Sequence, residues 1–324
     1  MKLKCLLFVV MLFALALSAA ADTMFSGTLY YTNFCCGVDN VNKVQYTYDQ
    51  TTQTFNMGTH VAIASTPGAD GIIFAPNGDL LIGGQNTNHI YEVNPGTGTI
   101  TFNTALQDQS YHLALDPGGT KVYTSNFGGP LITAGLTGGH LDGTSTITPI
   151  TGGDTGVTQI AFAGGKTFYD SGFPNCCGDF GLINLTTGVT TKLGNGTAVH
   201  GMIYDSFTGL ITFFGDGWVG TLNPTTLAFT EAQISNCNFD QGAVDGSGHA
   251  LIAGCDSVTF LDYSGSHNIE NPNFVTVVGG FTNIDDVAPL SGIGSHTAPE
   301  PSSLLLIGSG LLGLLGWVRR RHSK

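Results

Sequence analysis

Short apolar segments separated by tight turns recur along most of the chain. Residues 72–74 are apolar, residues 75–79 carry Pro, Asn and Gly, and residues 80–82 are apolar again. This order predicts a strand, a turn and a second strand, because glycine with asparagine, serine or proline reverses a β-hairpin. No segment of the body keeps a helical period, so the sequence predicts an all-β fold. The same strand–turn–strand pattern returns at residues 112–124, 159–170, 201–214 and 242–254.

A third strand and a second turn follow in most repeats, as in residues 90–93 before the turn at 94–98. Four antiparallel strands that recur about every 40 to 45 residues are typical of a β-propeller blade. Six blades are predicted, and seven are the alternative because residues 126–157 are irregular. The innermost strands are expected to start near residues 72, 113, 160, 202, 243 and 286.

The last of these strands, 286–290, has no hairpin of its own. The body, however, begins with two strands, at 27–31 and 44–48, that lack an inner partner. The simplest arrangement has strand 286–290 complete the first blade, so that the two ends of the body close the ring. Closure removes the exposed strand edges that an open array would leave.

Both ends of the chain carry export signals. Lys2 and Lys4 precede an apolar run that ends in small residues, so residues 1–21 are predicted to be a secretory signal peptide. The propeller domain is expected over 22–295 and a sorting segment over 296–324. That segment contains a predicted transmembrane helix, 302–318, at the short limit for a membrane span. It ends in a basic cluster that holds such an end on the cytoplasmic side: Arg319, Arg320, Arg321 and Lys324.

The C-terminal segment also resembles a known sorting signal. Pro299, Glu300 and Pro301, a glycine-bearing apolar helix and an arginine cluster occur in the order typical of the PEP-CTERM signal of Gram-negative bacteria. The resemblance implies transient contact with the inner membrane, recognition by an exosortase, cleavage near residues 299–301 and release to the cell surface or outside the cell. Members of that family often accompany exopolysaccharide and biofilm formation. The alternative is a permanent tail anchor.

The body loosely resembles the NHL/YVTN type of bacterial propeller, as in the phrase IYEVNPGTG at residues 90–98. This resemblance implies a scaffold whose functions range from ligand binding to lactone hydrolysis. Fold does not decide between these functions.

The exported body is strongly acidic. Signal and tail contain six of the ten Lys and Arg residues, which leaves four lysines against 23 acidic residues, a net charge of about −19. Such a body is repelled by nucleic acid and by anionic lipid, so neither is an expected partner. Divalent cations or neutral glycans suit it better, and solubility is a sufficient alternative explanation of the charge.

Six cysteines remain after signal removal, an even number that predicts disulfides in an oxidising compartment. Propeller topology places all six on one face, in loops that enter first strands or follow second strands. Cys237 and Cys255 are expected to form a bridge between neighbouring loops. The doublets Cys35–Cys36 and Cys176–Cys177 either form vicinal disulfides or pair with each other, and the first arrangement needs shorter loops.

The residues just before each innermost strand should surround the mouth of the central channel, on that same face. A ring of carboxylates, imidazoles and an amide suits a divalent cation or a polarised ligand. It is also compatible with a channel filled only by water. The predicted mouth residues are Asp70, His112, Gln159, His200, Asp240 and Asp285.

Common catalytic signatures are missing from the sequence: there is no Gly-x-Ser-x-Gly elbow, no phosphate-binding glycine loop and no His-Glu-x-x-His. The sequence therefore favours a non-catalytic propeller that acts as a binding or matrix component at the cell surface. The alternative function is a lactonase-like hydrolase that uses a divalent cation at the channel mouth.

Overall fold

The computed structural model describes residues 24–34, 37–154, 156–171, 178–196 and 199–289. The chain divides into two units, of which the larger comprises Ser26–Thr47 and Phe55–Ile293. The described part of the smaller unit is Met24, Phe25 and Tyr48–Thr54, which contains the turn between β2 (Val41–Asp49) and β3 (Thr54–Met57). In that turn, Asp49 Oδ1 accepts hydrogen bonds from the amides of Thr51 and Thr52.

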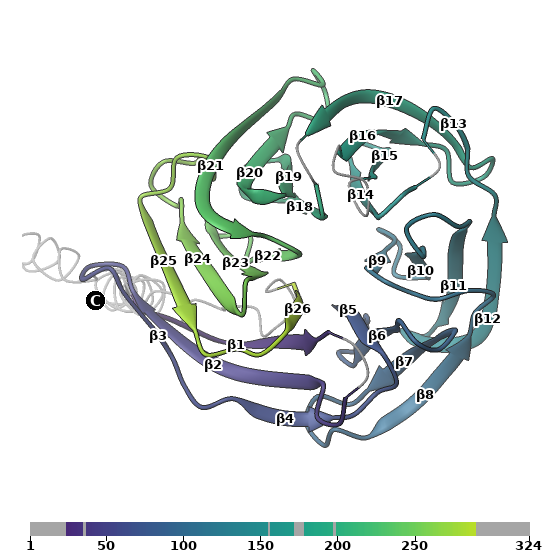
Figure 1. The fold of residues 1–324 in the computed structure, drawn as a ribbon, viewed down its shortest axis with the longest axis horizontal. Coiled ribbons are helices and arrows are strands. Elements are labelled where there is room, and N and C mark those ends of the chain that lie inside the picture. Colours follow the sequence, from purple (N-terminus) through teal and green to yellow (C-terminus); the bar gives the residue numbers. More distant parts are fainter. Residues whose placement is uncertain (1–23, 35–36, 155, 172–177, 197–198, 290–324) are drawn as a thin grey trace, which may run out of the picture. The chain divides into compact units, whose positions relative to one another are not determined.

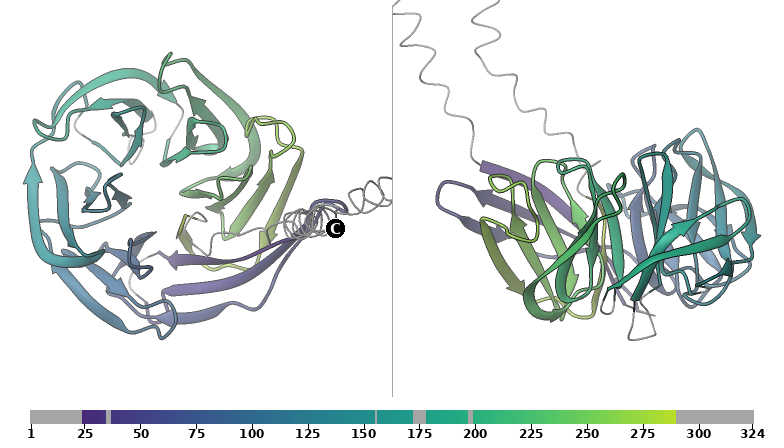
Figure 2. Two further views of the ribbon diagram at one scale, coloured as in Figure 1. Left: turned by 180° about the vertical axis from the view of Figure 1, so that it is seen from behind. Right: turned by 90° about the horizontal axis from the view of Figure 1, so that it is seen from above.

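The larger unit is a six-bladed β-propeller, as the sequence predicted. Six separate sheets of four or five strands follow one another around a ring (Figure 1), and in each sheet one strand lies at the centre. The strands run across the thickness of the ring (Figure 2, right). No helix within the described residues is long and apolar enough to cross a membrane. The predicted signal peptide and the predicted transmembrane helix 302–318 lie outside the described residues.

The first three blades are built mostly from consecutive strands. Blade 1 contains β26 (Ile284–Val287), β1 (Met24–Asn33), β2 (Val41–Asp49) and β3 (Thr54–Met57), with β4 (Val61–Ala64) paired to β2. Blade 2 contains β5 (Ala69–Phe74), β6 (Leu80–Gly84), β7 (His89–Val93) and β8 (Ile100–Ala105). Blade 3 contains β9 (Ala114–Leu115), β10 (Lys121–Thr124), β11 (Leu131–Thr137) and β12 (His140–Thr148).

The other three blades have the same order, from the innermost strand outward. Blade 4 contains β14 (Gln159–Ala163), β15 (Lys166–Asp170), β16 (Gly178–Ile183) and β17 (Val189–Gly196), with β13 (Thr151–Gly152) added. Blade 5 contains β18 (Gly201–Asp205), β19 (Leu210–Phe214), β20 (Asp216–Leu222) and β21 (Phe229–Asn238). Blade 6 contains β22 (Gly242–Val244), β23 (His249–Gly254), β24 (Ser257–Asp262) and β25 (Phe274–Gly279).

The ring closes through blade 1, where the last described strand pairs with the first. Tyr31 of β1 is opposite Val287 of β26, and the Ala288 amide donates to the Tyr30 carbonyl at 2.9 Å. The closing strand was predicted at 286–290 and lies at Ile284–Val287, because Pro289 has no amide hydrogen to continue the pairing.

Residues 126–157 looked irregular because they contain the two outer strands of blade 3, β11 and β12, and an additional strand of blade 4, β13. The register of strand β11 against β12 shifts between Ala134 and Leu136. The two-residue strand β13 then leaves blade 3 and pairs in parallel with β17 of blade 4. The irregular stretch is therefore an additional edge strand and a bulge, not a seventh blade.

The core lies between adjacent blades. Middle strands such as β6 and β24 are buried along their whole length, because a neighbouring blade covers each face. Between blades 4 and 5, the Phe180 ring lies 5.2 Å from that of Phe213 and 4.6 Å from that of Phe229. Outer strands such as β25 alternate between half-buried and exposed positions, as expected where one face is open.

One interface between blades holds a buried carboxylate. Glu92 of β7 accepts hydrogen bonds from the Asn77 amide at 2.9 Å and from the Leu141 backbone amide of blade 3 at 2.9 Å. Burial raises the pKa of Glu92, but these bonds and the adjacent His140 outweigh that effect, so the pKa falls below its usual value. The carboxylate is thus held ionised between blades 2 and 3.

Candidate functional site

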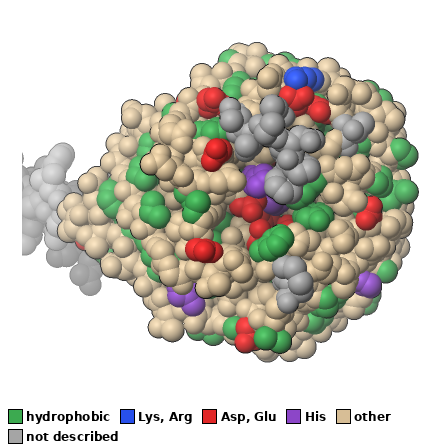
Figure 3. Space-filling model, viewed as in Figure 1, with side chains coloured by type: hydrophobic (Ala, Val, Ile, Leu, Met, Phe, Trp, Pro, Cys, Tyr) green, Lys and Arg blue, Asp and Glu red, His purple; other side chains and the backbone are tan. Residues whose placement is uncertain are grey.

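The predicted mouth residues lie at one end of the innermost strands, on the face shown in Figures 1 and 3. Acidic and histidine side chains gather near the centre of this face (Figure 3). Topology explains this arrangement, because every blade presents the start of its innermost strand to the same end of the channel. Asp70 lies on β5, Gln159 begins β14 and Asp285 lies on β26, whereas His112, His200 and Asp240 precede β9, β18 and β22.

Asp70, His112 and Asp286 form the centre of the site. Each offers one ligand atom, and these atoms lie within 4.8 Å of one another. The His112 Nδ1 atom is 2.9 Å from Asp286 Oδ2. All three side chains are buried, so this group is shielded from solvent on most sides.

Irregular pairing directs these carboxylates into the channel. The register of β5 against β6 shifts between Ala69 and Ile72, next to Asp70. The register of β1 against β26 shifts between Tyr31 and Asn33, opposite the acidic pair. Bulges of this kind re-aim side chains and are frequent beside functional sites. The Thr32 hydroxyl joins the two irregular places, since it donates to the Asp70 carbonyl at 2.6 Å and accepts from the Asp286 amide at 3.2 Å.

Asp240 and His200 extend the site toward solvent. Asp240 Oδ1 lies 3.4 Å from His200 Nδ1 and 3.7 Å from His112 Nε2, and about a quarter of the Asp240 side chain is exposed. Asp285 is buried beside Asp70 and Asp240. Five of the six predicted mouth residues therefore come together, and Asp286 joins them.

Gln159 does not join the cluster. Its Oε1 atom accepts a hydrogen bond from the Met202 amide at 2.7 Å, so the side chain connects blade 4 to the innermost strand of blade 5. Gln85, which was not predicted, takes part instead: its Nε2 donates to Asp70 Oδ2 at 2.9 Å. Gln85 follows β6, a position that carried no recognisable signal in the sequence.

Burial and close approach raise the pKa values of the acidic side chains in this site. Burial and the neighbouring Asp286 raise the pKa of Asp70 to about 8. Burial and the charges of Asp70 and Asp240 raise the pKa of Asp285 well above its usual value. Burial also raises the pKa of Asp286, against the opposing charge of His112. The site thus holds more negative charge than its surroundings stabilise.

The pKa values of His112 and His200 shift in opposite directions. Burial lowers the pKa of His112, but Asp286, Asp240 and Asp70 together outweigh it and raise the pKa to about 10. Burial lowers the pKa of His200, and the charge of His112 adds to that shift. The charged form of His112 is therefore favoured among four acidic side chains, three of which have raised pKa values, and the neutral form of His200 is favoured at the solvent side.

When the acids of this cluster are ionised, three of their oxygens accept no hydrogen bond from the described residues: Asp70 Oδ1, Asp285 Oδ2 and Asp286 Oδ1. All three side chains are at least nine-tenths buried. The side-chain hydrogen bonds of Asp285 to Asp70 and Asp240 require a proton shared between two carboxyl groups. A buried carboxylate oxygen without a donor costs free energy, whereas carboxylates and imidazoles are the usual ligands of divalent metals. The arrangement is chemically suited to bind a divalent cation.

Asp170 is a further acidic residue that the sequence did not reveal. It ends β15, pairs in register with Gln159 and is completely buried. Burial raises its pKa well above the usual value, although the charge of His112 partly opposes the shift. Its position on a second strand, not before an innermost strand, kept it out of the predicted ring.

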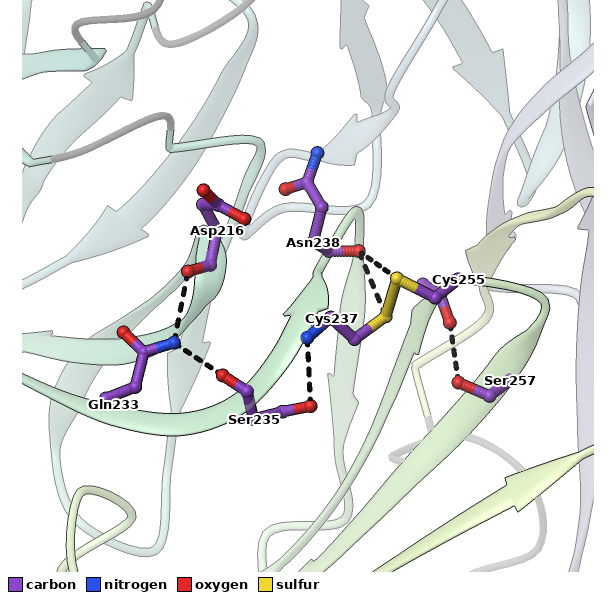
Figure 4. Close-up of a disulfide and its surroundings, with 8 residues drawn as sticks. Asp216, Gln233, Ser235, Cys237, Asn238, Cys255 and Ser257 are labelled. Carbon is purple, nitrogen blue, oxygen red and sulfur yellow. Dashed lines mark hydrogen bonds between the residues drawn. A yellow bond between two sulfur atoms is a disulfide. The ribbon is translucent and has the colours of Figure 1, made fainter.

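The predicted bridge between Cys237 and Cys255 is present, with Cα atoms 5.7 Å apart (Figure 4). Cys237 is the second-to-last residue of β21, the outer strand of blade 5, and its amide donates to Ser235 Oγ at 3.1 Å. Cys255 lies in the turn between β23 and β24. The doublets Cys35–Cys36 and Cys176–Cys177 lie outside the described residues.

The disulfide fixes two loops that carry site residues. Cys237 precedes Asp240 by three positions in the loop that enters β22. On the other side, Cys255 and Asp256 have φ angles of 49° and 53°, which is the geometry of a two-residue hairpin turn. Asp256 Oδ1 accepts a hydrogen bond from the Asn283 amide at 2.6 Å, two residues before Asp285.

The comparisons with known proteins decide the nature of the C-terminal segment. Residues 297–321 match the PEP-CTERM protein-sorting motif. The chain carries a PEP-CTERM sorting signal. Such a signal implies recognition by an exosortase and secretion with a membrane-anchored C-terminal sorting step, as the sequence predicted. No curated protein sequence matches the chain.

Solved structures share the propeller fold at low sequence identity. A chain from a nidogen/laminin complex is 11% identical with a TM-score of 0.58, over 82% of this chain and 98% of that one. The virginiamycin B lyase of Staphylococcus aureus is 12% identical with a TM-score of 0.51, over 79% of this chain and 89% of that one. At such identities the likeness concerns the fold alone.

Proposed function

We propose that this PEP-CTERM protein is a non-catalytic binding propeller of the cell surface or extracellular matrix, and that its channel mouth holds a divalent cation. The observation that carries the cation proposal is the set of buried, unpartnered oxygens on Asp70, Asp285 and Asp286. Asp70, His112 and Asp286 are the proposed first ligands, with Asp240 and His200 on the solvent side. The ligand that the cation helps to bind is proposed to be an exopolysaccharide.

Charge supports this proposal. A cation at the mouth takes the place of the protons that the raised pKa values of Asp70, Asp285 and Asp286 favour, and it offsets the repulsion among the ionised groups. The body around it carries a net charge of about −19 that attracts divalent ions. Hydroxyl groups of a glycan can complete the coordination shell of such an ion, because oxygen ligands suit hard cations. This mode of binding needs no nucleophile or general acid.

The cation proposal is tested by metal analysis of the purified propeller. We expect about one equivalent of a divalent metal per chain by inductively coupled plasma mass spectrometry. After chelation, Ca²⁺, Mg²⁺, Mn²⁺ and Zn²⁺ added singly should reveal which ion raises the midpoint of thermal unfolding. A protein that contains no metal and that none of these ions stabilises would contradict the proposal.

A second candidate function, a cation-dependent lactonase-like hydrolase, is favoured by one observation. Asp240, partly open to solvent, lies within 4 Å of two imidazoles, and such a group could move a proton. Turnover of a lactone panel that stops on chelation and in Asp240→Asn would favour the hydrolase over the non-catalytic propeller.

We also propose that the sorting segment is removed by cleavage near Pro299–Pro301, after residues 1–21 have directed export. Substitution of Glu300 by Ala should leave full-length protein in the inner membrane, because the processing enzyme would no longer recognise the segment. Immunoblots of membrane and medium fractions measure this, with Ser302→Ala as the matched control. Normal release of Glu300→Ala would argue against processing at this motif.

A further inference from the structure

A second hollow lies at the opposite end of the innermost strands from the channel mouth. It is a cleft of about 430 Å³. Its walls come from the ends of β14 and β18 and from the turns that follow β9 and β14, on the face seen in Figure 2, left. The lining residues are Pro117, Phe162, Ala163, Gly164, Gly165, Lys166, Thr167 and Tyr204.

Aromatic side chains line the cleft, and two glycines, which have no side chain, form its edge. The Tyr204 side chain is 41% exposed although it lies on an innermost strand, and Phe162 is half-buried. Gly164 and Gly165 have φ angles of 56° and 71° and make the turn between β14 and β15. Glycine suits both positions, and the absence of a Cβ leaves the backbone open to a ligand.

The charge of the cleft is opposite to that of the body. Only four lysines remain in the exported body, and one of them, Lys166, lines this cleft. None of the lining residues is acidic. The Lys166 ammonium donates to the Pro224 carbonyl of blade 5 at 2.8 Å, which holds it between the two blades. An ammonium group has three N–H donors, so the bond to Pro224 leaves donors for a ligand.

We infer that this cleft binds an acidic sugar, a uronate residue of a polysaccharide, through Tyr204, Phe162 and Lys166. A pyranose ring presents apolar C–H faces that pack on aromatic side chains, and its carboxylate forms a charge-assisted hydrogen bond with an ammonium. A cleft of this volume is within the range of small-molecule sites. The inference rests on the proposed binding role in the matrix, but it uses a site remote from the cation cluster.

The test measures binding of a galacturonate tetrasaccharide by isothermal titration calorimetry, with a neutral glucose tetrasaccharide as reference. A buffer of about 0.15 M salt screens the long-range repulsion from the acidic body. Chelator is present throughout, so that a cation at the channel mouth plays no part. We expect the acidic sugar to bind with at least about tenfold higher affinity than the neutral one, as one charge-assisted bond provides.

Variants assign the binding to the cleft. Lys166→Met should lower the affinity for the acidic sugar about tenfold and leave the neutral sugar unaffected, whereas Lys166→Arg should retain binding. Tyr204→Ala should weaken both sugars. The controls are Lys121→Met, a lysine outside the lining, and Phe102→Ala, an exposed aromatic residue of blade 2. Thermal unfolding of each variant verifies that the propeller remains folded.

Three outcomes would overturn the inference. The first is equal affinity of the wild type and Lys166→Met for the acidic sugar. The second is a complete lack of binding at millimolar sugar. The third is binding that appears only when chelator is omitted, which would assign the sugar to the channel mouth. Failure of the mouth to bind a metal leaves this test unchanged, so the two proposals fail separately.

Discussion

Asp286→Asn should abolish the stabilisation of the propeller by divalent cations. Asp286 contributes one of the unpartnered buried oxygens and also holds the His112 ring, so its loss removes a ligand and misplaces another. A cation at a hundred times its dissociation constant adds about 2.7 kcal/mol to the free energy of unfolding. For a domain of this size we expect a gain of about 5–10 °C in the unfolding midpoint of the wild type and none in the variant.

The matched control is Asp79→Asn, in the other group of acidic and histidine side chains. Asp79, Glu92 and His140 also offer ligand atoms within 4.8 Å of one another. There, however, the Asn77 amide lies among the acceptors, 2.9 Å from Glu92 Oε1 and 3.3 Å from Asp79 Oδ2. Asp79→Asn should therefore keep the full cation-induced shift. A shift retained by Asp286→Asn and lost in Asp79→Asn would move the site to the interface of blades 2 and 3.

The pH dependence of the cation-induced shift in the unfolding midpoint provides a second readout. The pKa of Asp70 is raised to about 8 in the metal-free fold, so the folded state gains a proton there relative to the unfolded chain. The metal-free protein should thus lose stability as pH rises from about 4 toward 8. A bound cation removes that loss, so the cation-induced shift should be larger at pH 8 than at pH 5.

The blade pattern could be predicted from the sequence because turn chemistry is local. Glycine with Asn, Pro or Ser marks each hairpin, and the apolar segments between turns give the strands. Closure by a strand near residue 286 followed from the unpaired strands at the start of the body. The short parallel strand β13 could not be predicted, because its pairing with β17 depends on where blade 4 leaves an edge free.

The site was predicted less completely, since it depends on register. Residues predicted to precede the innermost strands do lie together, because each blade presents that position to the same end of the channel. They are Asp70, His112, His200, Asp240 and Asp285. The bulges at β5 and β26 bring Asp286 to His112 as well, and no local pattern indicates that. Gln159 turns toward blade 5 because the Met202 amide needs an acceptor there. Asp170 lies on the second strand of blade 4, whereas the prediction considered only residues that precede innermost strands.

Removal of the disulfide by Cys237→Ala and Cys255→Ala together should lower the free energy of unfolding by about 3 kcal/mol. The bridge joins residues 18 positions apart, and the entropy of closing a loop of that length in the unfolded chain accounts for this value. Urea denaturation of wild type and double variant, with the thiol state verified by intact mass, measures the difference. Equal unfolding midpoints would show that the bridge contributes no stability.

The same double variant should also weaken cation binding, because the bridge fixes both loops that deliver carboxylates to the channel mouth. Cys237 lies three residues before Asp240, and the Cys255 turn reaches Asp285 through the hydrogen bond from the Asn283 amide to Asp256. Asp256→Ala, which keeps the bridge and removes this hydrogen bond, separates the two routes. If Asp256→Ala alone reproduces the loss of affinity, the turn positions Asp285 directly. If only the double variant loses affinity, the bridge acts through the Asp240 loop.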